Sequence, residues 1–542
     1  MTMKKLCLAG ILCLLAACLT SVAAAEEDKP SAVRSRRTNV VVFPAFAEDG
    51  AGQNLALGIA DRAASELDRT GKFNNFHLKQ VFAVARSHLM TSQDLASEEK
   101  ALLAARLMGA EAGVFGKLTA ADDGWKLTWT VFDLGSDKQS AGEKELAEDA
   151  AAAVREGGRA QAAAIMSLLG MKPPAAGIAH PDTDSGPAMQ AYLSCYRVII
   201  NQSMGLRKSH VIRPAVLTDA RSDCLQAVKE DPDFSAAWAT LSLVYSLAFK
   251  QDDAARALQK SEAQPGLLAL RNIARYWFKT RFEGSRQGAK VMSESAEKHP
   301  GALIFWTYLG EHLNITRQYE KALQVWNNYL EMVPASPFAM AQKGYCLARL
   351  SRLNESITIT TKACKADACN MDLQLELASR LVDAGQLDGA QSILEPLIDK
   401  PGVFGEVVLR LGYVYLLKDQ NDKAEKYFKK ALDMARGPHE WRTRGRARYD
   451  LAIVMARKGK LEKAEKYLLD AAWEGFAVRD VLTNNPDLQV LAKRPAVVHL
   501  FEGKTPRRRK LRLHTTPFPV DYSGKVMPEA KRTPPSMTGI NF

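Results

Sequence analysis

Residues 303–334 read LIFWTYLGEHLNITRQYEKALQVWNNYLEMVP, and this stretch decides the fold. Its first half carries a small residue, Gly310, among large apolar ones, and its second half ends at Pro334. A small residue lets two helices approach closely while large neighbours fill the space between them. Proline cannot continue a helix and has no backbone donor, so it ends the second helix. The stretch therefore predicts a hairpin of two antiparallel helices.

The hairpin pattern recurs seven times. The anchor at the eighth position of each unit is Ser242, Tyr276, Gly310, Gly344, Ala378, Gly412 and Ala452. Successive anchors are 34 residues apart, except that the last interval is 40 because of an insertion around Gly437 and Pro438. One hairpin cannot bury its apolar face alone, so stacked hairpins share a continuous core. The period predicts a mainly helical solenoid.

The pattern resembles the tetratricopeptide repeat family. Its typical positions are filled in the unit quoted above by Trp306, Leu309, Gly310, Leu313, Ala322, Trp326, Tyr329 and Pro334. The match is weak in residues 269–300, where Arg275 and Tyr276 replace the Leu-Gly pair. The resemblance implies a curved groove that holds other molecules and seldom catalyses a reaction.

We expect this array to cover residues 187–502. A degenerate hairpin is expected near its start, at 191–201 and 217–230, and closing helices at its end, at 485–501. Terminal repeats are atypical because they present a polar end to water.

The amino terminus has the features of a secretory signal: Lys4 and Lys5 precede twelve apolar residues, 6–17. A membrane span needs roughly 20 apolar residues. Two processing sites compete. The sequence LAAC at 15–18 resembles a bacterial lipobox, which would remove residues 1–17 and lipidate Cys18; AAA at 23–25 resembles a signal-peptidase site, which would remove residues 1–25. Both predict an exported protein of the periplasm, and the first predicts a membrane-anchored lipoprotein.

Five cysteines follow the signal, and export would place them in an oxidising compartment. Cys195 and Cys224 fall on the two helices of one hairpin and are a candidate disulfide. Cys364 and Cys369 flank a turn and are a second candidate pair. Buried free thiols are the alternative for Cys224 and Cys346.

The net charge of +12 is concentrated at the carboxyl terminus. Residues 503–542 form a Pro-rich segment, expected to be disordered, with nine Lys or Arg against two acidic residues. We therefore expect no nucleic-acid binding. In an exported protein, residues 507–510 (RRRK) would attract anionic head groups, glycans or an acidic partner. A solvated tail without a function is the alternative.

The hydrophobic pattern of residues 38–170 predicts a small α/β domain. The expected strands are 40–43, 76–78, 113–119 and 125–132, and the expected helices are 54–69, 98–107 and 147–169. The segments 41–46, 57–60 and 107–118 resemble the amino-terminal domain of TolB, a periplasmic protein; the α/β domain of the curli-export lipoproteins is a related resemblance. Segments 26–37 and 171–186 are expected linkers, and the second is rich in Pro and Gly, which would let the domains move.

Sequence motifs for catalysis are missing. The chain has no P-loop, no His-Glu-x-x-His and no Gly-x-Ser-x-Gly, and its nine histidines are scattered singly. We therefore expect no enzyme, no catalytic residues, no metal site and no cofactor.

In the repeat family, positions 2, 5, 9, 12 and 13 of the first helix line the groove. The candidate partner-binding residues at these positions are Phe338, Tyr345, Arg349, Leu409, Tyr413, Leu416, Arg446, Tyr449 and Arg457. Tyrosine and arginine are enriched in binding hot spots, so we expect an extended peptide or a helix as ligand. The alternative is that the tyrosines only cover contacts between repeats.

These observations favour a non-catalytic scaffold or adaptor of the cell envelope that binds protein partners. Two alternatives stay open: an exported sensor for a small molecule or glycan, and a component of a curli-type secretion apparatus.

Overall fold

The structure is a computed structural model that describes residues 37–88, 90–173, 183–204, 214–264, 268–400, 403–437, 440–476 and 485–501. The signal segment with Cys18, almost all of the first expected linker, the middle of the second and the basic tail lie outside the described residues.

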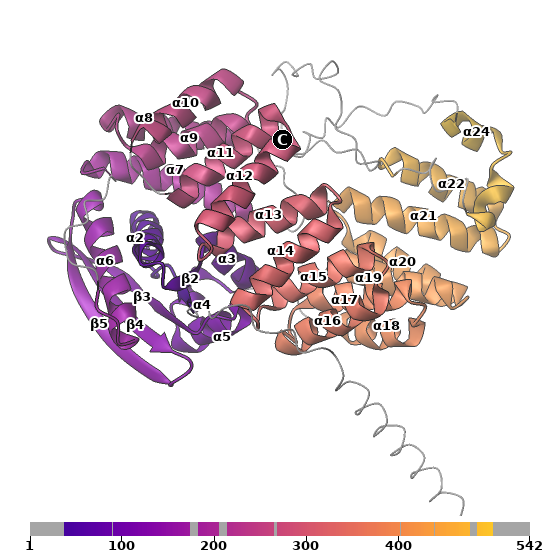
Figure 1. Cartoon of the computed structure of the whole chain (residues 1–542). Coiled ribbons are helices and arrows are strands. Elements are labelled where there is room, and N and C mark those ends of the chain that lie inside the picture. The colour runs from indigo at the N-terminus through magenta and orange to yellow at the C-terminus, as the bar shows by residue number, and fades with distance from the viewer. Residues whose placement is uncertain are drawn as a thin grey trace, which may run out of the picture. The chain divides into compact units, whose positions relative to one another are not determined.

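Seven consecutive helix pairs run from Ser235 to Trp473 in the described part of the chain (Figure 1). The first helices of the pairs are α9 (Ser235–Leu247), α11 (Leu268–Phe278), α13 (Leu303–Ile315), α15 (Pro337–Arg349), α17 (Met371–Asp383), α19 (Gly405–Leu417) and α21 (Trp441–Arg457). The second helices are α10 (Gln251–Ala263), α12 (Ser285–Lys298), α14 (Tyr319–Met332), α16 (Leu353–Ala366), α18 (Leu387–Leu394), α20 (Asn421–Met434) and α22 (Leu461–Trp473). Every anchor residue lies on a first helix, so the predicted register is confirmed.

The ends of the array also follow the prediction. The hairpin of α7 (Gly186–Met204) and α8 (Pro214–Glu230) precedes the seven pairs. A 3-10 helix at Pro486–Leu491 and helix α24 (Pro495–Phe501) follow them. Leu488 and Leu491 are buried in the same core cluster as Leu451, so this segment covers the apolar end of the last pair.

The small anchors are needed because large side chains face them. A Cβ atom on Gly310 would lie 2.4 Å from the ring of Trp326, and one on Gly412 would lie 2.7 Å from Phe428. Both aromatic side chains are fully buried. The first helix therefore touches the second through its backbone, and the large ring fills the space beside it.

The amino-terminal region contains a five-stranded sheet in the order β2-β1-β3-β4-β5. Its strands are β1 (Thr38–Val42), β2 (Phe73–Phe76), β3 (Ala112–Ala121), β4 (Gly124–Asp133) and β5 (Lys138–Ala147). Strands β2, β1 and β3 are parallel, and β3, β4 and β5 are antiparallel. Its helices are α2 (Gly50–Arg69), α3 (Leu78–Ser87), α4 (Ser92–Leu95), α5 (Glu98–Met108) and α6 (Ala150–Leu168).

Three elements of this region, α3, α4 and β5, were not predicted, and one strand was misplaced. Strand β5 is mostly exposed and rich in Lys and Glu, so it carries no apolar alternation. The segment 76–78 was predicted as a strand, but β2 ends at Phe76 and Leu78 begins α3. The pattern failed there because β2 buries two asparagines: Asn74 Nδ2 donates to Asn39 Oδ1 at 2.9 Å. A hydrogen-bonded polar pair replaces the expected apolar run.

Helix α2 joins the α/β region to the array. A Cβ atom on Gly58 would lie 2.7 Å from Leu193 of α7 and 2.9 Å from Val154 of α6. The absence of a side chain at this position lets both helices approach α2. One cluster of buried residues consequently runs from Val40 in the sheet to Cys346 in α15, so the two regions share a core across the expected linker.

Cys195 of α7 and Cys224 of α8 form a disulfide, which closes a loop of 29 residues. The second candidate pair is wrong: Cys364, Cys369 and Cys346 are free. The reason is position. Cys364 packs against the array core, whereas Cys369 is exposed in the turn after α16.

We predict that Gly310→Ala destabilises the chain although alanine favours helix by about 1 kcal/mol. The new methyl group meets the immobile Trp326 ring, and overpacking costs about 1–3 kcal/mol. The control is Gly389→Ala in α18, where the nearest atom lies 3.5 Å from the new Cβ; it should stabilise. Thermal unfolding of both variants measures the effect. Shifts of the thermal midpoint in the same direction would contradict the packing argument.

We predict that reducing the disulfide lowers the thermal midpoint, because closing a 29-residue loop contributes about 3–4 kcal/mol. The Cys224→Ser variant should have the same thermal midpoint as the reduced wild type, and this midpoint should not change when reductant is added. Alkylation of Cys195 in the folded, unreduced protein would show that the bond is missing.

Candidate partner-binding groove

The nine candidate residues come from three first helices, α15, α19 and α21. Phe338, Tyr345, Tyr413 and Arg446 are half-buried, and Arg349 is exposed. Leu409, Leu416 and Tyr449 are only 3%, 2% and 5% exposed. These last three fill the contacts between repeats, as the alternative interpretation expected for tyrosines, and they leave little surface for a partner.

Tyrosine rings and arginine side chains alternate along the face of these helices. Tyr319 and Tyr345 meet edge to face at 6.1 Å between ring centroids. Arg349 lies over the ring of Tyr319 at 5.5 Å, and Arg380 over that of Tyr345 at 5.7 Å. One repeat further on, the guanidinium of Arg446 lies 5.1 Å from the ring of Tyr413. Stacking of this kind fixes the long arginine side chains in place.

The Arg446 guanidinium is also held by a carboxylate. Its Nε lies 3.0 and 2.9 Å from the two oxygens of Asp450, which is fully buried. Burial raises the pKa of the Asp450 carboxyl, and the attraction of Arg446 opposes this rise. The pair therefore has a structural role, and Arg446 presents to a partner only the part of its side chain that faces solvent.

Arg457 fastens the closing segment. Its guanidinium lies 2.9 Å from Asp419 and 2.9 Å from Asp487, and it donates to the Leu416 carbonyl at 3.0 Å. Asn485 Nδ2 donates to the Tyr449 hydroxyl oxygen at 3.0 Å. Both contacts tie the segment from Asn485 to the last two first helices, so Arg457 is engaged within the chain.

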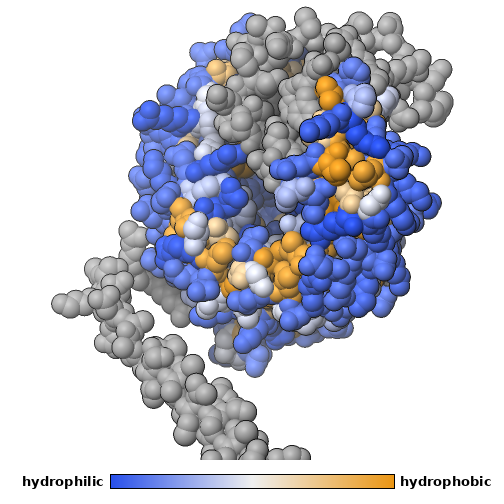
Figure 2. Space-filling model, turned by 90° about the vertical axis from the view of Figure 1, so that its right-hand side faces the viewer, coloured by the Kyte–Doolittle hydropathy of each residue, from blue (hydrophilic) through white to orange (hydrophobic). Residues whose placement is uncertain are grey.

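Leu417 is a groove residue that the sequence reasoning missed. It is 40% exposed at position 13 of α19, the same position that selected Arg349 and Arg457. Applying the position rule without a preference for tyrosine and arginine would have found it. Figure 2 views the molecule from the side on which Figure 1 draws α20–α22, and shows a hollow bordered by hydrophobic residues. We call the surface of Tyr345, Arg349, Tyr413, Leu417 and Arg446 the downstream groove.

The same positions are covered in the earlier repeats. On α13, positions 2, 5 and 9 are Ile304, Thr307 and Glu311, and we call them the upstream groove. Lys79 Nζ lies 3.4 Å from Glu311 Oε2, and Gln80 Nε2 donates to Thr307 Oγ1 at 3.2 Å. Both partners come from α3 of the α/β region. Helix α3 therefore occupies part of this face of α13, although Ile315 at position 13 is 44% exposed.

The described residues offer little to a cofactor. Among them, no group of three or more His, Cys, Asp or Glu side chains could hold a metal ion. Two cavities lie where the α/β region meets the array, beside Asp61, and measure about 30 and 20 Å³. Such volumes admit about one water molecule each.

We predict that Arg446→Met costs about 2–3 kcal/mol, because it leaves the buried Asp450 carboxylate without its counter-ion. This free-energy cost is set below that of a fully buried pair because the Arg446 side chain is partly exposed. Adding Asp450→Asn should recover part of the loss. Arg352→Met, which breaks an exposed pair with Glu355, should change stability much less than Arg446→Met does, because water screens the exposed pair. Chemical denaturation measures all three, and equal effects in Arg446→Met and Arg352→Met would contradict the assignment.

The comparisons with known proteins agree with this register. Residues 406–472, which span α19–α22, match the family model described as tetratricopeptide repeat. A comparison with curated proteins finds no significant match.

Among solved structures, the chain is similar to a tetratricopeptide repeat protein from Parabacteroides merdae (15% identity, 48% of this chain, 99% of that chain, TM-score 0.35). It is also similar to YrrB, titled a TPR protein with an unusual peptide-binding site (19%, 40%, 99%, TM-score 0.28). A third is PilW, titled a type IV pilus biogenesis factor (18%, 41%, 97%, TM-score 0.32). Because these TM-scores are below 0.5, the likenesses carry no argument about partners. The helix pairs of this chain form a tetratricopeptide-repeat array that follows a small α/β region.

Proposed function

We propose that this chain is a non-catalytic scaffold of the bacterial cell envelope, which binds a protein partner in the downstream groove. The observation that carries the proposal is the contrast between the two parts of the groove. On α13 the groove positions are filled by α3, whereas on α19 and α21 they present Tyr413, Leu417 and Arg446.

The downstream groove has the chemistry of a peptide-binding surface. Leu417 supplies an exposed aliphatic side chain, and the stacked tyrosines and arginines around it supply large, ordered contact areas. Ordered side chains lose little conformational entropy when a partner binds. An extended segment or an amphipathic helix that places an apolar residue over Leu417 fits this face best.

Export is part of the proposal. The signal-like residues 1–25 are its basis, and Cys18 is the candidate lipid anchor. The Cys195–Cys224 disulfide supports an oxidising compartment, since structural disulfides are rare in the cytosol. No helix in the described part of the chain is long and apolar enough to cross a membrane. The resemblance of the α/β region to the TolB amino-terminal domain belongs to the same proposal.

The described cavities do not favour a sensor for a small molecule. Pockets for organic ligands usually measure about 300 Å³ or more, and the two cavities measure about 30 and 20 Å³.

We predict that Leu417→Asp lowers capture of the partner from crosslinked cells by at least about tenfold, because it puts a charge at the apolar contact. The matched control is Leu225→Asp on α8, since Leu225 is 42% exposed and Leu417 is 40%. Quantitative mass spectrometry of the captured proteins compares both variants with wild type. Identical lists of captured proteins for wild type and Leu417→Asp would contradict the assignment of the downstream groove as the partner-binding surface.

A further inference from the structure

Helix α3 lies on the array as a ligand lies in a groove. Besides its contact with Glu311, Lys79 lies over the ring of Tyr308, with Nζ 4.1 Å from the ring centroid. Gln80 Nε2 also donates to the Tyr329 hydroxyl oxygen at 3.0 Å. Three repeats further on, the places of Thr307 and Glu311 are taken by Leu409 and Tyr413. Helix α3 thus contacts in α13 the positions that are equivalent in α19 to Leu409, which is buried, and Tyr413, which is half-buried.

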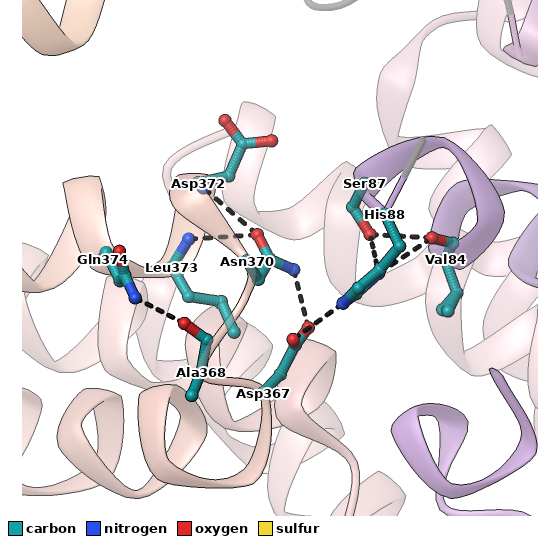
Figure 3. A network of polar contacts seen from close by, with 9 residues as sticks. All are labelled: Val84, Ser87, His88, Asp367, Ala368, Asn370, Asp372, Leu373 and Gln374. Carbon is teal, nitrogen blue, oxygen red and sulfur yellow. Dashed lines mark hydrogen bonds and ion pairs between the residues drawn. The ribbon is translucent and has the colours of Figure 1, made fainter. Parts of the chain in front are cut away.

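A second contact fixes the far end of α3. His88 Nε2 lies 2.8 Å from Asp367 Oδ1, although the two residues are 279 positions apart. Figure 3 shows His88, in the turn after α3, aimed at Asp367 between α16 and α17. Their side chains are 7% and 5% exposed. Asn370 Nδ2 donates to the other Asp367 oxygen at 2.9 Å, and the Asn370 side chain also caps α17.

We propose that helix α3 is a pH-sensitive occupant of the upstream groove, held in place by protonated His88 paired with Asp367 and loosened when His88 loses its proton, while the core shared by the α/β region and the array stays intact. The geometry supports this directly. The two side chains are almost completely buried, and the pair joins the end of α3 to the turn between α16 and α17, 279 positions further along the chain.

The direction of the pH effect follows from the pair. Burial lowers the pKa of His88, but the hydrogen bond and charge of Asp367 and the Val84 carbonyl outweigh it, so the pKa is raised above the ordinary 6.5. The charged form is therefore favoured when the clasp is closed. Its contribution is complete below pH 6.5 and is lost as the pH rises through the raised pKa.

The cavity at the other end of the junction adds two titratable groups. Burial raises the pKa of Asp68 to about 7, with Asn75 opposing and Asp61 adding to the rise. Burial and Lys79 lower the pKa of His77 to about 4. As the pH rises from about 4 to 6.5, Asp68 loses stability and His77 gains it, so the two changes oppose each other. Asp68 is half-titrated near pH 7 and completes its titration near pH 8, so between pH 7 and 8 both Asp68 and His88 weaken the junction.

Hydrogen exchange of the full chain tests this without any partner. Peptides from α3 and α13 are followed at about pH 6, 7 and 8, after correction for the intrinsic pH dependence of exchange. We expect opening of α3 to increase between pH 7 and 8, because the pKa of His88 is raised when α3 is closed on the array and the stabilisation is lost as the pH rises through that raised pKa. Peptides from α20, which is far from the junction in sequence, should not change.

The variant His88→Gln keeps a hydrogen-bonding side chain but takes up no proton, so the rise in opening of its α3 between pH 7 and 8 should be clearly smaller than in wild type, with only the contribution of Asp68 left. Glu143→Gln on the exposed strand β5 is the control and should behave as wild type. Circular dichroism verifies that each variant is folded. If His88→Gln is unfolded, Asp367→Asn is used instead, because it removes the same ion pair by changing the carboxylate partner. Equal opening of wild-type α3 at pH 7 and 8, or an unchanged rise in both clasp variants, would overturn the proposal.

Discussion

The contact between a small residue on one helix and a large ring on the next is the constraint on which this structure depends. At Gly310 and Gly412 a single methyl group would collide with Trp326 or Phe428. Close contact there sets the position of each first helix against its second helix. A small residue occupies the anchor in six of the seven pairs (Tyr276 is the exception), so the same positions of each first helix fall on one face, and that face is the groove.

One set of positions consequently has two uses. In α13 it holds the chain's own α3 through Lys79 and Gln80, and in α19 and α21 it carries stacked tyrosine and arginine side chains. The glycine at Gly58 makes the first use feasible, since it lets α2 contact α7 closely enough to bring the sheet and α3 against the array. The α/β region therefore limits where a partner has room to bind.

The array was predictable because its pattern is present in seven units and a small residue occupies the anchor of every unit except the second. Helix α3 and strand β5 were not, because neither follows a clear apolar pattern over a long enough stretch. Within the groove, position alone did not separate Leu409 and Tyr449, which are buried, from Tyr413 and Leu417, which face solvent. Burial depends on the neighbouring repeat. The His88–Asp367 pair joins residues 279 positions apart, and no local pattern in the sequence signals such a contact.

The central claim is that the downstream groove is the surface that meets a partner. Site-specific photocrosslinking in living cells tests it most directly, with a photoreactive amino acid placed at Leu417 and, separately, at Leu225. The account predicts a discrete crosslinked protein from position 417 and none of that identity from position 225. The same product from both positions, or a product from position 225 alone, would contradict it.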